Sequence, residues 1–142
     1  MATILLVDDE KVARTVYGDY LTEAGHAVTR VSSVAEAKAA LALHPVDLVI
    51  TDLILPSGHG MDVLQHTKDR YPSVEVLVIT ALDEVDPAVR AIKSGAAEYL
   101  VKPVNPEALT HGPYAALHDD FPHHGYGSGH RSGGTPLLKL HC

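Results

Sequence analysis

Five short apolar runs, separated by segments with helical periodicity, constrain the fold of this 142-residue chain more than any other feature. The runs are nearly continuous in Val, Ile and Leu, which is typical of parallel strands buried on both faces. In the segments between them, apolar residues recur every three or four positions, as on one face of a helix. The expected strands are 3–7, 27–31, 47–51, 74–80 and 98–101. Alternating strands and helices, joined by right-handed crossovers, predict a doubly wound α/β domain with a five-stranded parallel sheet.

Capping and helix-breaking residues limit the expected helices. Ser33, with Glu36 three residues later, is a capping box. A capping residue followed by proline, which favours the first helical position, occurs at Asp86-Pro87 and again at Asn105-Pro106. Together with the periodicity, these signals predict helices over 11–24, from 33 to about 43, over 61–70, from 86 to about 93 and from 105 onward.

Charge and composition argue against several classes of protein. The net charge of −7 disfavours direct nucleic-acid binding, because phosphate contacts need clustered Lys and Arg. The one cysteine, Cys142, cannot form an intrachain disulfide. The N-terminus has no signal-peptide pattern, and no apolar run approaches the length of a membrane span. We therefore expect a cytoplasmic domain that neither enters a membrane nor binds nucleic acid directly.

Polar side chains follow four of the five expected strands. They are Asp8, Asp9 and Glu10 after the first strand, Asp52 after the third, Thr80 at the end of the fourth and Lys102 after the fifth. The carboxyl ends of parallel strands share one edge of the sheet, where α/β proteins bind ligands. Clustered carboxylates repel one another, and a hard cation with oxygen ligands, such as Mg²⁺, offsets their charge. Glu10 is interpreted only as an acid that favours the positive start of a helix.

A phosphoryl group suits such an edge. A carboxylate can accept it as an aspartyl phosphate. Lys102 can neutralise one phosphoryl oxygen, and the Thr80 hydroxyl can donate a hydrogen bond to another. Asp52 alone would be an ordinary turn acid, and its combination with the other polar residues favours a functional interpretation.

Four stretches, "LLVDDE", "VITDLILPSGHG", "VITA" and "YLVKP", resemble in order and spacing the response-regulator receiver domain of two-component signalling. The resemblance extends from residue 3 to about residue 110. It implies the flavodoxin-like strand order 2-1-3-4-5 and a phosphorylated signalling domain of a bacterial response regulator. A histidine kinase or phosphotransfer protein would supply the phosphoryl group. Such a domain catalyses its own phosphorylation and dephosphorylation, with no separate substrate turnover.

The resemblance assigns roles to particular positions of this sequence. Asp52 would be the phosphoacceptor, and Lys102 would contact the phosphate. Mg²⁺, or alternatively Mn²⁺, would be held by Asp8, Asp9, Asp52 and the backbone carbonyl of Ile54. Thr80 and Tyr99 would be the switch residues, and a cis peptide bond would precede Pro103. On phosphorylation, Thr80 would move toward the phosphoryl group and Tyr99 would turn inward. The face formed by helix four, strand five and helix five would then change.

The lifetime of the phosphoryl group can also be anticipated. In the family, the side chains two residues beyond the acceptor and two beyond the switch hydroxyl influence its hydrolysis. Here they are Ile54 and Leu82. Neither can hold an attacking water by hydrogen bonding, so the sequence predicts a phosphoryl group that lasts many minutes.

Residues 111–142 depart from the family pattern. Gly112-Pro113 should break the fifth helix soon after it begins, and the remainder is rich in His and Gly without periodicity. We therefore place the receiver domain at 1–110. The tail is interpreted as a linker stub, a non-native end, a docking segment or, least favoured, a transition-metal site at His118, His123 and His124. A shortened fifth helix would expose apolar surface and favour a homodimer through the face of helix four, strand five and helix five.

Three alternatives use similar residues. A phosphatase of the haloacid dehalogenase type would need an acid at position 54, which is Ile. A flavodoxin-like electron carrier would need a hydroxyl-rich phosphate loop after the first strand, where this chain has three acids. A degenerate receiver that signals by binding alone would not need the complete set of site residues.

Overall fold

A five-stranded parallel sheet forms the centre of the computed structural model, which describes residues 1–56 and 58–105. Its strands are β1 (Thr3–Val7), β2 (Ala27–Val31), β3 (Leu48–Thr51), β6 (Glu75–Thr80) and β7 (Glu98–Val101). Their order in the sheet is β2-β1-β3-β6-β7. The predicted order 2-1-3-4-5 is confirmed, since β6 and β7 are the fourth and fifth strands of this sheet.

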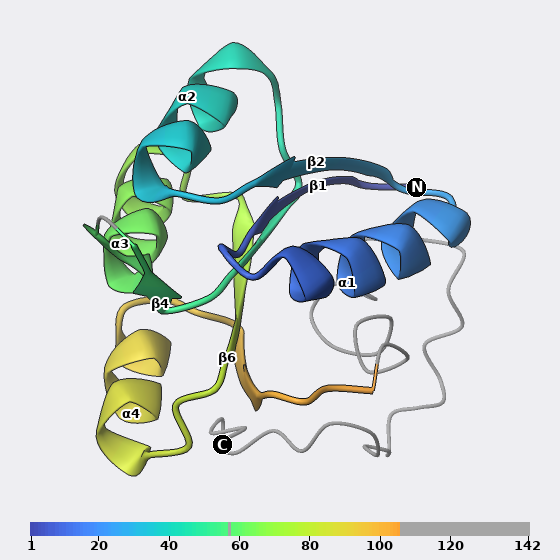
Figure 1. Cartoon of the computed structure of the whole chain (residues 1–142). Helices are drawn as coiled ribbons and strands as arrows, with labels where there is room; N and C mark the ends of the chain where they lie inside the picture. The colour runs from blue at the N-terminus through green and yellow to red at the C-terminus, as the bar shows by residue number, and fades with distance from the viewer. Residues whose placement is uncertain (57, 106–142) are drawn as a thin grey trace, which may run out of the picture.

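Four helices cover the two faces of the sheet. They are α1 (Lys11–Glu23), α2 (Val34–Leu43), α3 (Gly60–Arg70) and α4 (Val85–Lys93). Figure 1 shows α1 on one side of the sheet and α2, α3 and α4 on the other. Alternate residues of each strand serve different faces. In β1, for example, Ile4 and Leu6 pack in the core beside α1, whereas Leu5 and Val7 pack in the core beside the other three helices.

The second helix begins with a variant of the predicted capping box. The Ser33 hydroxyl accepts a hydrogen bond from the Glu36 backbone N–H at 3.1 Å. The Glu36 carboxylate reaches back to the Ser32 backbone N–H at 2.8 Å, one residue earlier than the pattern predicts. Hydrogen bonds from the Ser32 N–H and the Ser32 hydroxyl favour the charged form of the Glu36 carboxylate and lower its pKa.

The predicted start of the fourth helix is wrong by about two residues. The helix begins at Val85 after the N-cap residue Glu84, so Asp86 and Pro87 are its second and third residues. The third residue of a helix has no carbonyl partner for its backbone N–H, so a proline is tolerated there as it is at the first residue. The proline therefore marks the first turn but not the first residue.

Several expectations lie outside the described residues. These are the course of the fifth helix beyond Asn105, all interpretations of the tail 111–142, including the sites at His118, His123 and His124, and the state of Cys142. No helix in the described part of the chain is long and apolar enough to cross a membrane.

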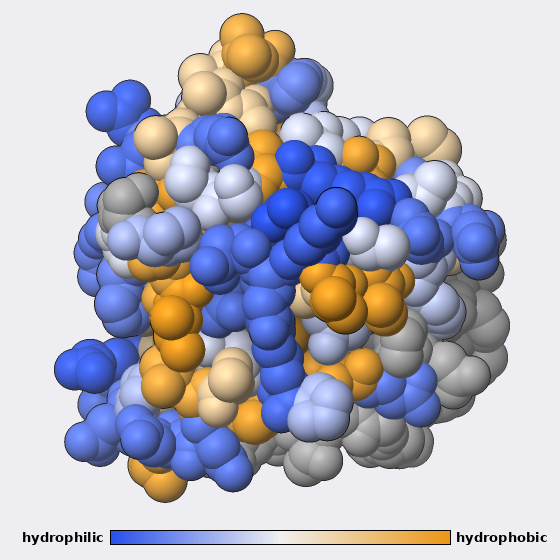
Figure 2. Space-filling model, in the orientation of Figure 1, coloured by the Kyte–Doolittle hydropathy of each residue, from blue (hydrophilic) through white to orange (hydrophobic). Residues whose placement is uncertain are grey.

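The surface mixes hydrophilic and hydrophobic groups. Figure 2 shows a hydrophilic band across the middle of the face seen in Figure 1, with separate hydrophobic patches beside it. Among the described residues, the large hydrophobic side chains that are exposed are Met1, Val12, Val16, Leu43, Ile54 and Val85. One of these, Ile54, lies two residues after Asp52.

Candidate functional site

The ends of four strands bring the predicted polar residues to one edge of the sheet. Asp8 directly follows β1, Asp52 follows β3, Thr80 ends β6 and Lys102 follows β7. The hydrogen-bonding ladder extends one residue beyond the strands. The Asp52 backbone N–H donates to the Val7 carbonyl at 3.0 Å, and the Lys102 N–H donates to the Thr80 carbonyl at 2.8 Å. The backbone positions of the site are therefore set by the sheet.

The Lys102 ammonium joins three carboxylates. Its Nζ lies 2.8 Å from Asp8 Oδ2, 2.8 Å from Asp52 Oδ2 and 2.8 Å from Glu10 Oε1. Asp8 is 2% exposed and Asp52 is 5% exposed. Two carboxylates that are nearly removed from water thus share one cation.

The second oxygen of each buried carboxylate is held by the backbone. Asp8 Oδ1 accepts a hydrogen bond from the Glu10 N–H at 2.9 Å, and Asp52 Oδ1 accepts one from the Ile54 N–H at 3.0 Å. Both bonds span two residues, the spacing at which an Asp side chain folds back onto its own chain in a turn. Both carboxylates are consequently fixed in orientation before any ligand binds.

Burial and charge act against each other in this cluster. Burial raises the pKa of Asp8, and hydrogen bonds from Lys102 and the Glu10 N–H only partly offset it. Burial alone would lower the pKa of Lys102, but the hydrogen bonds to Asp52, Asp8 and Glu10 outweigh it and raise this pKa above its usual value. Lys102 therefore remains an ammonium ion, and the four charged groups together carry an excess of negative charge.

This donor set fits a hard divalent cation. All the side-chain ligands offered by Asp8 and Asp52 are oxygens, which Mg²⁺ prefers, and the excess negative charge favours a cation. Across residues 1–56 and 58–105, no three acidic, His or Cys side chains are gathered as a preformed metal-binding group. The fit rests on donor chemistry and charge, with Asp8 and Asp52 buried and Asp9 exposed.

In the structure Glu10, and not Asp9, forms an ion pair with Lys102. Asp9 is exposed and is not part of the ion-pair cluster around Nζ. Glu10 is the N-cap residue of α1, but its side chain makes no capping bond and pairs with Lys102 instead. The interpretation of Glu10 as a helix-start acid therefore missed its partner. The sequence places both residues at the same edge of the sheet, but it does not show which of the three consecutive acids reaches the lysine 92 positions away.

Thr80, Leu82 and Tyr99 form a short chain of hydrogen bonds beside the acidic cluster. The Leu82 backbone N–H donates to Thr80 Oγ1 at 3.4 Å, and the Tyr99 hydroxyl donates to the Leu82 carbonyl at 2.8 Å. Tyr99 is fully buried, and burial raises its pKa to about 12. The Tyr99 ring lies inward, the position that the family resemblance assigns to this switch residue after phosphorylation. The peptide bond between Lys102 and Pro103 is cis.

The loop after Asp52 is a small hairpin that the sequence analysis did not predict. It pairs β4 (Ile54–Leu55) with β5 (Gly58–His59) in antiparallel fashion. His59 then caps α3, with its Nδ1 accepting a hydrogen bond from the Met61 N–H at 3.2 Å. Strands of two residues are too short to show periodicity, so this element has no sequence signature.

Gly60, the first residue of α3, approaches the loop after Asp52 closely. A Cβ atom at this position would overlap the Asp52 carbonyl oxygen and lie 2.6 Å from the Leu53 Cα. The Gly60 N–H donates to the Leu53 carbonyl at 2.9 Å. The absence of a side chain thus allows the start of α3 to sit directly against the backbone that carries Asp52.

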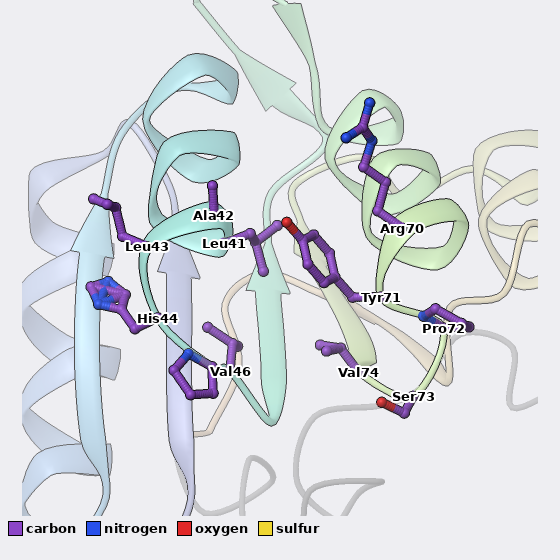
Figure 3. A pocket seen from close by; sticks show the side chains of 11 residues that line it. Leu41, Ala42, Leu43, His44, Val46, Arg70, Tyr71, Pro72, Ser73 and Val74 are labelled. Carbon is purple, nitrogen blue, oxygen red and sulfur yellow. The ribbon is translucent and has the colours of Figure 1, made fainter.

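A hollow lies at the edge of the sheet opposite to the acidic cluster, between the segments that enter β3 and β6. Its floor is apolar, with Leu41, Val46 and Val74, and the Tyr71 ring points toward Leu41 (Figure 3). His44 and Arg70 stand at its rim. The hollow contains none of the residues of the acidic cluster, so it is not the predicted site.

Fold and site together define a flavodoxin-like α/β domain with a carboxylate–lysine cluster at the carboxyl edge of its sheet. Residues 4–112 match the family model of the response regulator receiver domain, and the chain belongs to this family. It is therefore the receiver domain of a two-component response regulator.

Individual relatives agree with this assignment. The response regulator protein FleR of Pseudomonas aeruginosa is 41% identical over 108 residues, which cover 76% of this chain and 23% of FleR. The DNA-binding transcriptional regulator NtrC of Azospirillum brasilense is 33% identical over 121 residues, which cover 85% of this chain and 25% of NtrC. The chain thus spans about a quarter of the length of these relatives.

A solved structure shares the fold. The signal receiver domain of an HD domain-containing protein from Pseudomonas fluorescens Pf-5 superposes with a TM-score of 0.77 at 28% identity. The match covers 82% of this chain and 94% of that chain. The similarity extends over nearly the whole of that domain.

Proposed function

We propose that Asp52 accepts a phosphoryl group from a histidine kinase or phosphotransfer protein. The observation that carries this proposal is the contact of 2.8 Å between Lys102 Nζ and the buried Asp52 Oδ2 at the carboxyl edge of the sheet. A lysine in that position can neutralise a phosphoryl oxygen on Asp52. Membership of the receiver family supports the same role.

The chemical step is an in-line transfer. A carboxylate oxygen of Asp52 attacks phosphorus, a P–O bond forms, and the P–N bond of the partner's phosphohistidine breaks. The neutral imidazole remains with the partner. The Ile54 N–H, at 3.0 Å from Oδ1, holds the carboxylate in one orientation during the attack. Lys102 stays charged and moves with the group it neutralises.

We assign Mg²⁺, or alternatively Mn²⁺, to Asp8, Asp9, Asp52 and the Ile54 carbonyl. A bound divalent ion would offset the charge that the phosphoryl oxygens bring to the pocket. Among these ligands, Asp8 has the strongest physical reason to bind a cation, because burial makes its ionised form costly.

Phosphorylation adds a charge of about −1.5 to −2 to the pocket. We propose that the Thr80 hydroxyl donates a hydrogen bond to this group. Movement of Thr80 would then shift the Leu82 backbone, to which both Thr80 and Tyr99 are hydrogen-bonded. We propose that phosphorylation shifts a pre-existing equilibrium in which the buried Tyr99 ring takes part. The face around α4 and β7 is the proposed output surface, including for a homodimer.

Among the similar proteins, NtrC is named as a DNA-binding transcriptional regulator. The prediction that this chain itself does not contact nucleic acid stays a prediction, based on its net charge of −7. We likewise propose a cytoplasmic location, a domain boundary near residue 110 and a signalling role without separate substrate turnover.

The phosphoryl group is expected to last for many minutes after the donor is removed. Ile54 is 50% exposed beside the acceptor, and its apolar side chain cannot hold an attacking water. Following the decay of the phosphorylated chain by intact mass, without any phosphatase, measures this lifetime. An Ile54→Asn variant should lose the group several-fold faster. A native lifetime of a few seconds would contradict the expectation.

Acetyl phosphate with Mg²⁺ tests the proposed function as a whole. The intact mass of the native chain should rise by one phosphoryl group, and omission of Mg²⁺ should slow the rise strongly. A chain that gains no phosphoryl group under these conditions would show that the pocket serves another purpose.

A further inference from the structure

Each of the three N–H donors of the Lys102 ammonium has a carboxylate partner. A lysine side chain carries three N–H donors and no acceptor. In the structure Nζ has three carboxylate partners, Asp8, Asp52 and Glu10, each at 2.8 Å. A phosphoryl oxygen can therefore bind Lys102 only if one of these partners gives up its hydrogen bond.

The three partners are not equally easy to release. The side chains of Asp8 and Asp52 are 3% and 6% exposed, so water cannot readily replace the lysine at either of them. The Glu10 side chain is 62% exposed, and water can solvate its carboxylate at once. Before transfer, releasing Glu10 leaves no buried carboxylate without its cation, whereas releasing Asp8 or the still ionised Asp52 does.

Resting on the proposed function, we infer that Glu10 is a positioning residue for Lys102 that competes with the phosphoryl group. Its carboxylate holds the ammonium in the unphosphorylated chain and gives it up when Asp52 is phosphorylated. The phosphoryl group assists the release, because its negative charge repels the Glu10 carboxylate. Glu10 therefore stabilises the unphosphorylated state selectively and slows phosphorylation.

The Glu10 side chain can be changed without disturbing the helix that follows. It makes no capping hydrogen bond, and the bond that orders this turn runs from the Glu10 backbone N–H to Asp8 Oδ1. A Glu10→Gln variant keeps the length of the side chain and removes its charge. Glu23, at the other end of α1, is exposed and provides a matched control as Glu23→Gln.

The first measurement is the rate of phosphorylation by acetyl phosphate at saturating Mg²⁺, in full-length protein. We expect Glu10→Gln to be phosphorylated roughly two- to fivefold faster than the native chain, the factor that corresponds to an ion pair with one exposed partner. Glu23→Gln should match the native rate. The native rate is itself the check on the proposed function: if the native chain is not phosphorylated, that function fails. If it is phosphorylated and Glu10→Gln is no faster, only the role of Glu10 is overturned.

The second measurement needs no phosphorylation and separates the ion pair from a general charge effect. Glu10→Gln, Lys102→Ala and the double variant form a cycle in the unfolding equilibrium of the unphosphorylated protein. Removing Glu10 should lower the folding equilibrium constant roughly two- to fivefold when Lys102 is present, and leave it nearly unchanged in Lys102→Ala. Absence of this coupling would overturn the inference even if Glu10→Gln is phosphorylated faster, because the acid would then act by its charge alone.

Discussion

Replacing Lys102 with methionine is expected to lower the free energy of unfolding at neutral pH by about 3 kcal/mol, the typical cost of leaving a buried charge without its partner. The ammonium is the shared cation of Asp8 and Asp52, at 2.8 Å from each. Methionine has a similar length and removes only the charge and the hydrogen bonds. Chemical denaturation of the two proteins, without Mg²⁺, measures the difference.

The loss is expected to shrink as the pH falls. Burial already raises the pKa of Asp8 in the native chain, so the folded state binds this proton more readily than the unfolded state. Such a carboxyl contributes stability that is present below its unfolded-state pKa and is lost as the pH rises through its folded-state pKa. Without Lys102 this pKa rises further, so protonation rescues the variant toward acid pH.

Lys38→Met is the matched control, because Lys38 is an exposed lysine on α2, outside the acidic cluster. It should change the free energy of unfolding by less than about 0.5 kcal/mol, as is usual at the surface. If Lys102→Met were as stable as Lys38→Met at neutral pH, or if its deficit grew toward acid pH, the buried ion pairs would not have the energetic role described here.

Gly60→Ala is the second substitution with a large expected effect. Its Cβ would meet the backbone on both sides, at the Asp52 carbonyl oxygen and at 2.6 Å from the Leu53 Cα, and neither can move like a side chain. Overpacking of this kind costs about 1–3 kcal/mol, and we expect the upper end of that range. Thermal unfolding measures the cost, and the displaced Asp52 backbone should also slow phosphorylation.

Gly18→Ala distinguishes this clash from a general effect of adding a methyl group in a helix. At Gly18, within α1, the three atoms nearest to an added Cβ all belong to the guanidinium end of Arg30, at 2.5–2.8 Å. That side chain can move, and alanine favours a helix over glycine by about 1 kcal/mol. Gly18→Ala should therefore be neutral or slightly stabilising. Equal destabilisation by the two substitutions would contradict the close approach at Gly60.

The sheet could be predicted from the sequence because burial on both faces leaves a clear signature. The apolar runs ending at Val7, Thr51 and Thr80 predicted the positions of the strands. The polar residues at the ends of these runs predicted the edge of the sheet at which a site forms. Gly25, just after α1, has a φ of 102°, which is strained for a residue with a side chain, so a glycine suits the end of this helix. Each of these features depends on neighbours in the sequence.

The features that escaped prediction depend on neighbours in space. Asp8 and Asp9 look equivalent in the sequence, but only Asp8 is buried beside Lys102. Glu10 acquires its partner through a contact across 92 positions. The hairpin after Asp52 and the cap of α3 by His59 arise from short-range geometry that has no repeating pattern.

Intact mass after incubation with acetyl phosphate and Mg²⁺ is the most direct test of Asp52 as the phosphoacceptor. The native chain and Asp69→Ala, which changes an exposed acid on α3, should both gain one phosphoryl group. Hydroxylamine should remove it, as expected for an acyl phosphate. Asp52→Ala should gain none while retaining the fold. A phosphoryl group that appears equally on Asp52→Ala, or a native chain that gains none, would contradict the assignment of Asp52.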